Sequence, residues 1–300
     1  MQQEQTKSIF VAIVGRPNVG KSSLLNRMVG EKVAIVTAKP QTTRTRITGI
    51  LTRGAVQYVF LDTPGIHRPR TRLGERMAKA TADSVAEVDA VVMLFEPYGE
   101  LTEAEQALVE DIRVKKVPAL AAVNKTDTLK KETDLAVRMQ FLEELGVFRG
   151  VLPLCVSEDR GCTELLDALL PFAVESPHYF PDDAYTDMPE KALVAEVLRE
   201  KMLLNLRDEI PHGVGVDILQ IKKIGDNLTE IHADLYCERA SHKSIIIGKQ
   251  GAMLRKIGSE ARVDIEKLMG TKIMLRLWVK VREDWRNRAG DLRTLGYEDD

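Results

Sequence analysis

The residues GRPNVGKS, at positions 15 to 22, have the types and spacing of a loop that holds a chain of phosphates. They follow the apolar run IFVAIV and precede SSLLNRMVG, so the loop joins an expected strand to an expected helix. Glycines let the backbone curl until successive N–H groups point at phosphate oxygens, and the helix amino end adds positive potential. The Lys21 ammonium can neutralise phosphate charge, and the Ser22 hydroxyl can bind Mg²⁺. The loop therefore predicts a nucleotide phosphate site.

Two downstream motifs extend this site. In DTPG (62–65), Asp62 follows a buried strand and can hold Mg²⁺ through water, while the Gly65 N–H can face a γ-phosphate. The loop PQTTRTR (40–46) offers Thr43 as a second Mg²⁺ hydroxyl, although such a loop is otherwise an ordinary solvated surface. The expected metal ligands are therefore Ser22, Thr43 and Asp62. The expected phosphate contacts are Gly15, Asn18, Val19, Gly20, Lys21, Ser22, Ser23, Asp62 and Gly65. The residues expected to take part in catalysis at the reacting phosphate are Asn18, Lys21, Thr43 and Gly65.

A third motif, NKTD (124–127), has the chemistry to recognise guanine. Asp127 can accept from both N–H groups on the Watson–Crick edge of the base, the Lys125 stem can cover a base face, and Asn124 can brace the loop. The last guanine contact is expected from a backbone N–H at Ser157, which begins SEDRG; a serine there is otherwise most often a helix N-cap. The phosphate loop, DTPG and NKTD, in this order and each at the end of a strand, predict a GTP site.

These motifs must be positioned by the secondary structure around them. Up to about residue 173, strand patterns alternate with helix patterns along the sequence, which predicts an α/β domain with a mostly parallel sheet. The helical patterns include 102–116, which begins with the capping box Thr102-x-x-Glu105, and 131–145. The expected strands are 9–14, 58–61, 90–95, 118–123 and 151–156.

Beyond residue 174 the pattern changes. The stretch ESPHYFPDDAYTDMPE (175–190) is rich in proline and acids and is predicted to be an interdomain linker. A helix over 189–206, strands over 213–224 and 228–237, helical periodicity over 244–269 and a strand over 272–281 then predict a smaller α+β domain with a three-stranded sheet. We therefore expect domains at 1–174 and 191–300.

The basic charge of the chain is concentrated in this second domain. The whole chain carries a net charge of −2, but residues 1–218 carry −5 and residues 239–288 carry +8. Within the basic part, GKQG (248–251) is a G-x-x-G turn between helices, which lets a nucleic-acid backbone approach closely. An ordinary helix–turn–helix glycine pair is the alternative. The expected RNA contacts are Ile247, Gly248, Lys249, Gln250, Gly251, Arg255, Arg276, Trp278 and Lys280.

Composition excludes several other classes of protein. The three cysteines are odd in number and lack CxxC spacing, which disfavours a disulfide framework and a zinc knuckle and suits a reducing cytoplasm. The amino terminus has no signal-peptide pattern, and no run approaches the roughly 18 apolar residues of a membrane span. A cytoplasmic, non-exported protein is the expectation.

The motifs GRPNVGKS, TTR, DTPG and NKxD with a late serine resemble the TrmE-Era branch of P-loop GTPases over residues 8–173. The runs at 194–212, 244–251 and 284–297 extend the resemblance to members with a C-terminal type II KH domain. It implies slow GTP hydrolysis, binding to the 3′ region of small-subunit ribosomal RNA, assistance to small ribosomal subunit maturation, peripheral contact with the inner membrane, and a monomer. It also implies a K⁺ ion beside Asn18, a residue that suits a simple turn equally well.

The sequence departs from the pattern of this branch at two places. Glu158 follows Ser157 where the branch usually has alanine, and Ile66 follows DTPG where many regulatory GTPases have a water-orienting glutamine. Two other functions remain open. The basic domain could bind anionic lipid in a membrane-associated signalling GTPase, or the chain could modify RNA, although residues 176–300 lack a second catalytic constellation.

Overall fold

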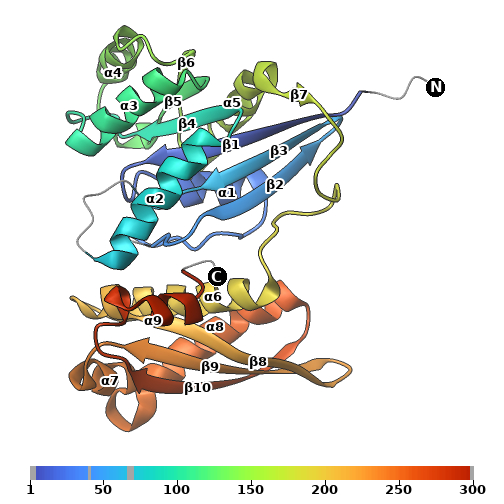
Figure 1. The fold of residues 1–300 in the computed structure, drawn as a ribbon, viewed down its shortest axis with the longest axis vertical. Helices are drawn as coiled ribbons and strands as arrows, with labels where there is room; N and C mark the ends of the chain where they lie inside the picture. Colours follow the sequence, from blue (N-terminus) through green and yellow to red (C-terminus); the bar gives the residue numbers. More distant parts are fainter. Residues whose placement is uncertain (1–4, 40–41, 66–70, 298–300) are drawn as a thin grey trace. The chain divides into compact units, whose positions relative to one another are not determined.

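The chain divides into two compact units, with the main division after Asp187. The structure, a computed structural model, describes residues 5–39, 42–65 and 71–297 (Figure 1). Each unit has a hydrophobic core of its own.

The first unit is built on a sheet whose strands run in the order β2-β3-β1-β4-β5-β6. All neighbouring pairs on this path are parallel except β2 with β3, so the expected mostly parallel sheet is confirmed. The strands are β1 (Lys7–Gly15), β2 (Ile47–Arg53), β3 (Val56–Asp62), β4 (Ala90–Phe95), β5 (Ala119–Val123) and β6 (Gly150–Pro153).

Helices cover both faces of this sheet, as its continuous apolar strands require. The core that includes Ala12 and Val14 also takes side chains from α2, α3 and α4, so the intervening Val11 and Ile13, both fully buried, face the other side. The helices are α1 (Lys21–Val29), α2 (Arg72–Ala86), α3 (Glu103–Lys115), α4 (Glu132–Glu144) and α5 (Cys162–Leu169). The predicted capping box of α3 is confirmed: the Thr102 side chain accepts from the Glu105 N–H, and the Glu105 carboxylate accepts from the Thr102 N–H.

The stretch expected as a linker is attached to the first unit over most of its length. β7 (Val174–Glu175) pairs antiparallel with β1, and residues 176–186, called the strap below, hydrogen-bond along β2 and β3. The buried Gln57 carboxamide oxygen accepts from the N–H groups of Tyr179 and Phe180 at 2.8 and 3.0 Å. Nearer β2, the Ile50 N–H donates to the Tyr185 carbonyl at 3.0 Å. Proline and acid content concealed these contacts because most of them involve the strap's backbone.

The second unit has the predicted αββααβ order, followed by one more helix. Its sheet runs β10-β9-β8, with β9 antiparallel to β8 and parallel to β10. The apolar sides of α6 and α8 pack with the sheet around residues such as Leu198, Ile218 and Ile257. The elements are α6 (Glu190–Asn205), β8 (Gly215–Gly225), β9 (Leu228–Cys237), α7 (Ala240–Ile247), α8 (Ala252–Met269), β10 (Lys272–Val281) and α9 (Ala289–Thr294). Among the described residues, no helix combines the length and apolarity needed to cross a bilayer.

Candidate functional site

The phosphate loop joins the end of β1 to the start of α1, where the sequence places it. Gly20 has a φ of +109°, and a Cβ at this position would lie 2.3 Å from the Asn124 amide nitrogen, so only glycine fits. The Lys21 ammonium donates to the carbonyls of Gly15 and Arg16 at 3.0 and 3.1 Å. The loop is therefore wrapped around a lysine that points into it.

Lys21 is a buried cation with 6 % of its surface exposed. Burial lowers the pKa of its ammonium to about 8, and the nearby Asp62 carboxylate opposes this shift. Removing a charge from water is costly unless an opposite charge compensates it. A phosphate chain in the loop would supply that compensation.

Three oxygen-bearing side chains converge beside Lys21. The Ser22 hydroxyl donates to Asp62 Oδ2 at 2.5 Å and lies 2.9 Å from the Thr43 hydroxyl, which is itself 3.5 Å from Asp62 Oδ2. The structure thus brings together the three expected metal ligands, although they come from α1, the loop before β2 and the end of β3.

The donor set at this point suits Mg²⁺. Asp62 is fully buried and its Oδ1 makes no hydrogen bond, while burial raises the pKa of its carboxyl to about 6 against the opposing charge of Lys21. An orphaned buried carboxylate oxygen beside two hydroxyls fits a hard cation that prefers oxygen ligands. Over the described residues, no group of three or more His, Cys, Asp or Glu side chains is placed to hold a metal, so the hydroxyls are essential to this candidate site.

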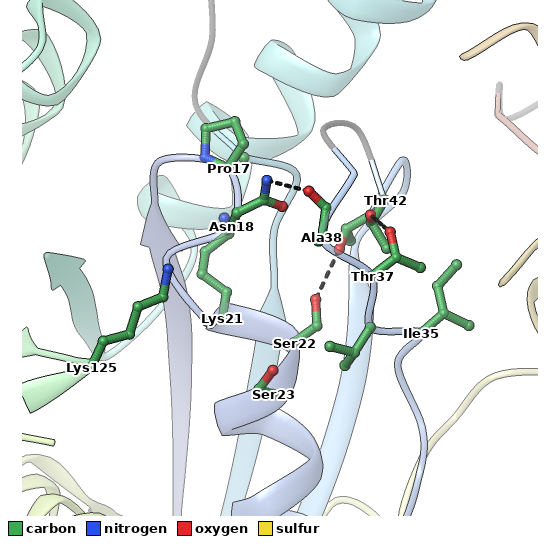
Figure 2. A pocket seen from close by; sticks show the side chains of 14 residues that line it. Pro17, Asn18, Lys21, Ser22, Ser23, Ile35, Thr37, Ala38, Thr42 and Lys125 are labelled. Carbon is green, nitrogen blue, oxygen red and sulfur yellow. Dashed lines mark hydrogen bonds between the residues drawn. The ribbon is translucent and has the colours of Figure 1, made fainter. Parts of the chain in front are cut away.

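Two adjoining pockets share the phosphate loop. The first, of about 320 Å³, is lined by Asn18, Lys21, Ser22, Thr43 and Gly65 among others (Figure 2). Its rim is tied to the loop before β2, because the Asn18 side-chain N–H donates to the Ala38 carbonyl at 2.8 Å. Ile66, which follows Gly65, lies outside the described residues.

The second pocket, of about 570 Å³, continues from the phosphate loop toward the NKTD motif. Lys125 lines both pockets, and Ser157 lines the second. Asn124 joins three segments, since its amide donates to the Val19 carbonyl at 2.8 Å and accepts from the Val156 N–H at 3.3 Å. Together the pockets have room for a phosphate chain at one end and a base at the other.

Asp127 is exposed and lines neither pocket, but it contacts Cys155, a partner that the sequence motif does not indicate and that lies beside Ser157 of the second pocket. Asp127 Oδ1 accepts from the Cys155 thiol at 3.1 Å, and the same sulfur lies 3.3 Å from the Ser157 hydroxyl. β6 ends at Pro153, not at 156 as expected, so the loop carrying the last guanine contact begins earlier. A thiol two residues after the end of a strand is the local signal for this contact.

The second unit contains a separate candidate site for nucleic acid around GKQG. Gly248 has a φ of +73°, and a Cβ there would lie 2.9 Å from the Met253 backbone nitrogen, so the turn requires glycine. Lys249 and Gln250 are exposed at its tip, and Ile247 precedes it at the end of α7. A groove of about 640 Å³ adjoins the turn and is lined by Gly251, Leu254, Arg255, Gly258, Ser259 and Arg262 and by residues of β10. Arg262, absent from the expected contacts, shares a helix face with Arg255 at a spacing of seven.

Three expected RNA contacts lie away from this groove. Arg276, Trp278 and Lys280 alternate along β10 with Leu275, Leu277 and Val279, which pack against the core, so they face the opposite side of the sheet. The positive charges of Arg276 and Lys280 are also compensated by nearby carboxylates.

The compensating groups come from β9. The Arg276 guanidinium is 2.6 Å from Glu230 and the Lys280 ammonium is 2.6 Å from Asp234. The Trp278 ring meets His232 edge-on. Strand alternation predicted the basic face of β10, but it could not reveal which residues of β9 lie beside it.

Comparisons with known proteins match both units. A family model described as a 50S ribosome-binding GTPase matches residues 10–125, and a KH domain model matches residues 209–286. The chain is 46 % identical over 292 residues to the GTPase Era of Ruminiclostridium cellulolyticum, covering 97 % of this chain and 98 % of that protein. It is 45 % identical over 294 residues to GTPase Era of Clostridioides difficile, covering 98 % and 99 %.

Two solved structures are similar over almost the whole chain. A crystal structure of a variant of Aquifex aeolicus Era bound to GDP·AlF₄⁻ has a TM-score of 0.93 at 34 % identity and covers 97 % of this chain and 99 % of its own. A crystal structure of Era in complex with MgGDPNP and nucleotides 1506–1542 of 16S ribosomal RNA gives the same TM-score, identity and coverage.

Proposed function

This chain belongs to the GTPase Era family, and from that premise we propose that it is a GTP-hydrolysing switch that binds small-subunit ribosomal RNA and assists maturation of the small ribosomal subunit. The observation that carries the proposal is the presence, in one chain, of a phosphate pocket with three converging oxygen ligands and a GKQG turn beside a groove. A structure similar over 97 % of this chain holds both a GTP analogue and 16S ribosomal RNA.

The proposed roles follow from the contacts in the first unit. Lys21 and the phosphate-loop N–H groups bind the β- and γ-phosphates, and Ser22, Thr43 and Asp62 hold Mg²⁺, which when bound neutralises phosphate charge. The Gly65 N–H is assigned to the γ-phosphate. Asp127 and Lys125 read and cover the base.

Other parts of the proposal concern the chain as a whole. We assign GTP binding to residues 1–174 and RNA binding to residues 191–300. A monomeric state, a cytoplasmic location and peripheral contact with the inner membrane stay predictions. The alternative of a signalling GTPase that uses its basic domain on lipid gains no support from the relatives, whereas the RNA-bound structure favours ribosomal RNA.

Replacing Lys249 and Gln250 by aspartates should reduce RNA affinity by at least about 100-fold and leave intrinsic GTP hydrolysis unchanged. Two carboxylates at the tip of the turn would repel the phosphates that it must approach. The positive φ of Gln250, 51°, is one that aspartate tolerates, so the turn should survive. Titration of a labelled 3′-end oligonucleotide of 16S ribosomal RNA measures the affinity.

The matched control makes the same change of charge elsewhere in the second unit. Gln220 and Lys222 are exposed on β8, so their replacement by aspartates should weaken RNA binding far less. Equal losses for the two pairs would show that only net charge matters and would contradict a specific GKQG contact. If the chain bound vesicles of anionic lipid but not the oligonucleotide, the membrane alternative would replace the proposal.

We propose that Asn18 also holds a K⁺ ion beside the phosphates. Its side chain lines the first pocket, and it lies in the phosphate loop with a φ of +62°. A monovalent cation there would neutralise charge that develops during hydrolysis. Asn18→Ala should therefore lower the hydrolysis rate in potassium buffer toward the wild-type rate in sodium.

The ratio of the two rates is the informative quantity in this experiment. Loss of the Asn18 contact to Ala38 and strain in an alanine at positive φ would lower both rates together. Only a lost cation site lowers the potassium rate selectively. Equal wild-type hydrolysis rates in potassium and sodium buffer would contradict the proposal that Asn18 holds a K⁺ ion.

A further inference from the structure

A cluster of charged side chains joins the phosphate loop to the NKTD motif and includes Lys125, which lines both nucleotide pockets. At its centre is Glu96, the first residue after β4, a strand that lies between β1 and β5 in the sheet. Glu96 Oε1 accepts from the Lys125 ammonium at 2.8 Å, and Glu96 Oε2 lies 3.7 Å from the Arg16 guanidinium. One carboxylate therefore faces a cation from each nucleotide motif.

Arg16 lies between two carboxylates, close enough for charge attraction but without a hydrogen bond to either. Besides Glu96, its Nε lies 3.5 Å from Glu105 Oε1, and Glu105 is fully buried. The other Glu105 oxygen is occupied by the N–H and hydroxyl of Thr102 in the capping box of α3. Glu105 is fixed by its own helix and places a negative charge beside Arg16, whose Nε and Nη2 make no hydrogen bond.

The backbone that carries Glu96 is fixed independently of Lys125. The Arg138 guanidinium, from α4, donates to the Glu96 carbonyl at 3.2 Å and to the Gly99 carbonyl at 2.8 Å. It also lies over the Phe95 ring, 5.8 Å from its centre. The main chain of Glu96 is thus fixed by Arg138, and the positive charge of Arg16 attracts its carboxylate, both independently of Lys125.

The Glu96 carboxylate restricts the conformation of the Lys125 side chain. Lys125 has a backbone φ of +63°, which a lysine rarely adopts, and its side chain lines both pockets with 35 % exposed. A free lysine side chain loses rotamer entropy when it is held in one conformation. A partner that holds the ammonium before the nucleotide arrives reduces that loss on binding.

We propose that Glu96 is a positioning residue for the nucleotide: with its main chain held by Arg138 and its carboxylate attracted by the charge of Arg16, it places the Lys125 side chain between the phosphate and base ends of the pocket. This inference rests on the proposed role of Lys125 at the base. Because the base is common to GTP and GDP, the effect should be equal for both nucleotides.

Glu96→Ala in the full chain should weaken GTP and GDP binding about tenfold each, and the hydrolysis rate at saturating GTP should stay within about twofold of wild type. Glu96→Gln retains an acceptor for the Lys125 ammonium and should recover part of the loss. A residue that only maintained the fold would lower thermal stability without this rescue. Glu110→Ala, which removes an exposed carboxylate paired with Arg113 on α3, is the matched control and should bind normally.

A double-mutant cycle tests whether Glu96 acts through Lys125. Lys125→Met keeps the apolar stem but has no ammonium, so in that background Glu96→Ala should cost less than about twofold. An equal loss in both backgrounds, or wild-type affinity for Glu96→Ala, would overturn the inference while leaving the GTPase function intact. If Glu96→Ala did not fold, the comparison of Glu96→Gln in the two backgrounds would decide between the same outcomes. Failure of the wild-type chain to bind guanine nucleotides would contradict the proposed function itself.

Discussion

Asp127→Asn should transfer the base preference of this protein from guanine to xanthine. A carboxylate accepts from both N–H groups of guanine, whereas an amide offers one acceptor and one donor and pairs with the additional carbonyl of xanthine. A site built to bond a polar group rejects an analogue that leaves that bond unmade by about 10⁴-fold or more. We therefore expect GTP affinity to fall by several orders of magnitude and XTP affinity to rise, as measured by competition against a fluorescent nucleotide.

The contact between Asp127 and Cys155 makes this substitution conservative in shape. An asparagine oxygen can still accept from the thiol that lies 3.1 Å from Asp127 Oδ1, so the side chain should keep its orientation. Asp134→Asn, at an exposed position in the first turn of α4, is the control and should leave both affinities unchanged. Unchanged GTP and XTP affinities for Asp127→Asn would mean that NKTD does not read the base.

Lys21→Ala should weaken GTP and GDP binding by roughly two to four orders of magnitude, because removal of one partner of a buried ion pair costs about 3–5 kcal/mol. In the nucleotide-bound protein the missing ammonium would leave phosphate charge uncompensated inside the loop. Without nucleotide the same change removes a buried cation whose hydrogen bonds go to the carbonyls of Gly15 and Arg16. The nucleotide-free protein should therefore remain folded, and calorimetric titration of GTP should detect the loss.

Two controls accompany the lysine substitution. Lys79→Ala, on the exposed side of α2, removes the same charge away from the pockets and should bind GTP normally. Circular dichroism of the nucleotide-free Lys21→Ala protein should retain the wild-type spectrum. Retained GTP affinity would contradict the assignment of the phosphate loop.

Local signals were sufficient to predict much of the fold. The strand at 228–237 and the strand at 272–281 were predicted with the bounds that the structure has, because their apolar residues alternate and turn residues flank them. The capping box likewise located the start of α3, because its two residues, Thr102 and Glu105, are only three positions apart in the sequence. β2 was not predicted, since Gly49 and the neighbouring threonines weaken its apolar pattern and its pairing with β3 is a long-range property.

The site was predictable where a motif carries its own geometry. The phosphate loop needs only its own residues to wrap around Lys21, so its sequence was enough. The contact of Cys155 with Asp127 depends on where β6 ends, and strand ends are set by pairing with the neighbouring strand. The compensation of Arg276 and Lys280 by Glu230 and Asp234 depends on the register between β9 and β10, which no local pattern reveals.

The strap protects an otherwise open edge of the sheet. β2 is the last strand on its side, and a row of unpaired backbone groups on such a strand is a template for pairing with another chain. Tyr185 takes up the Ile50 N–H and the Thr186 hydroxyl takes up the Thr48 carbonyl, so two of these groups are already occupied. A flexible glycine–serine segment of equal length would still connect the chain, but it would leave this edge free for self-association and aggregation.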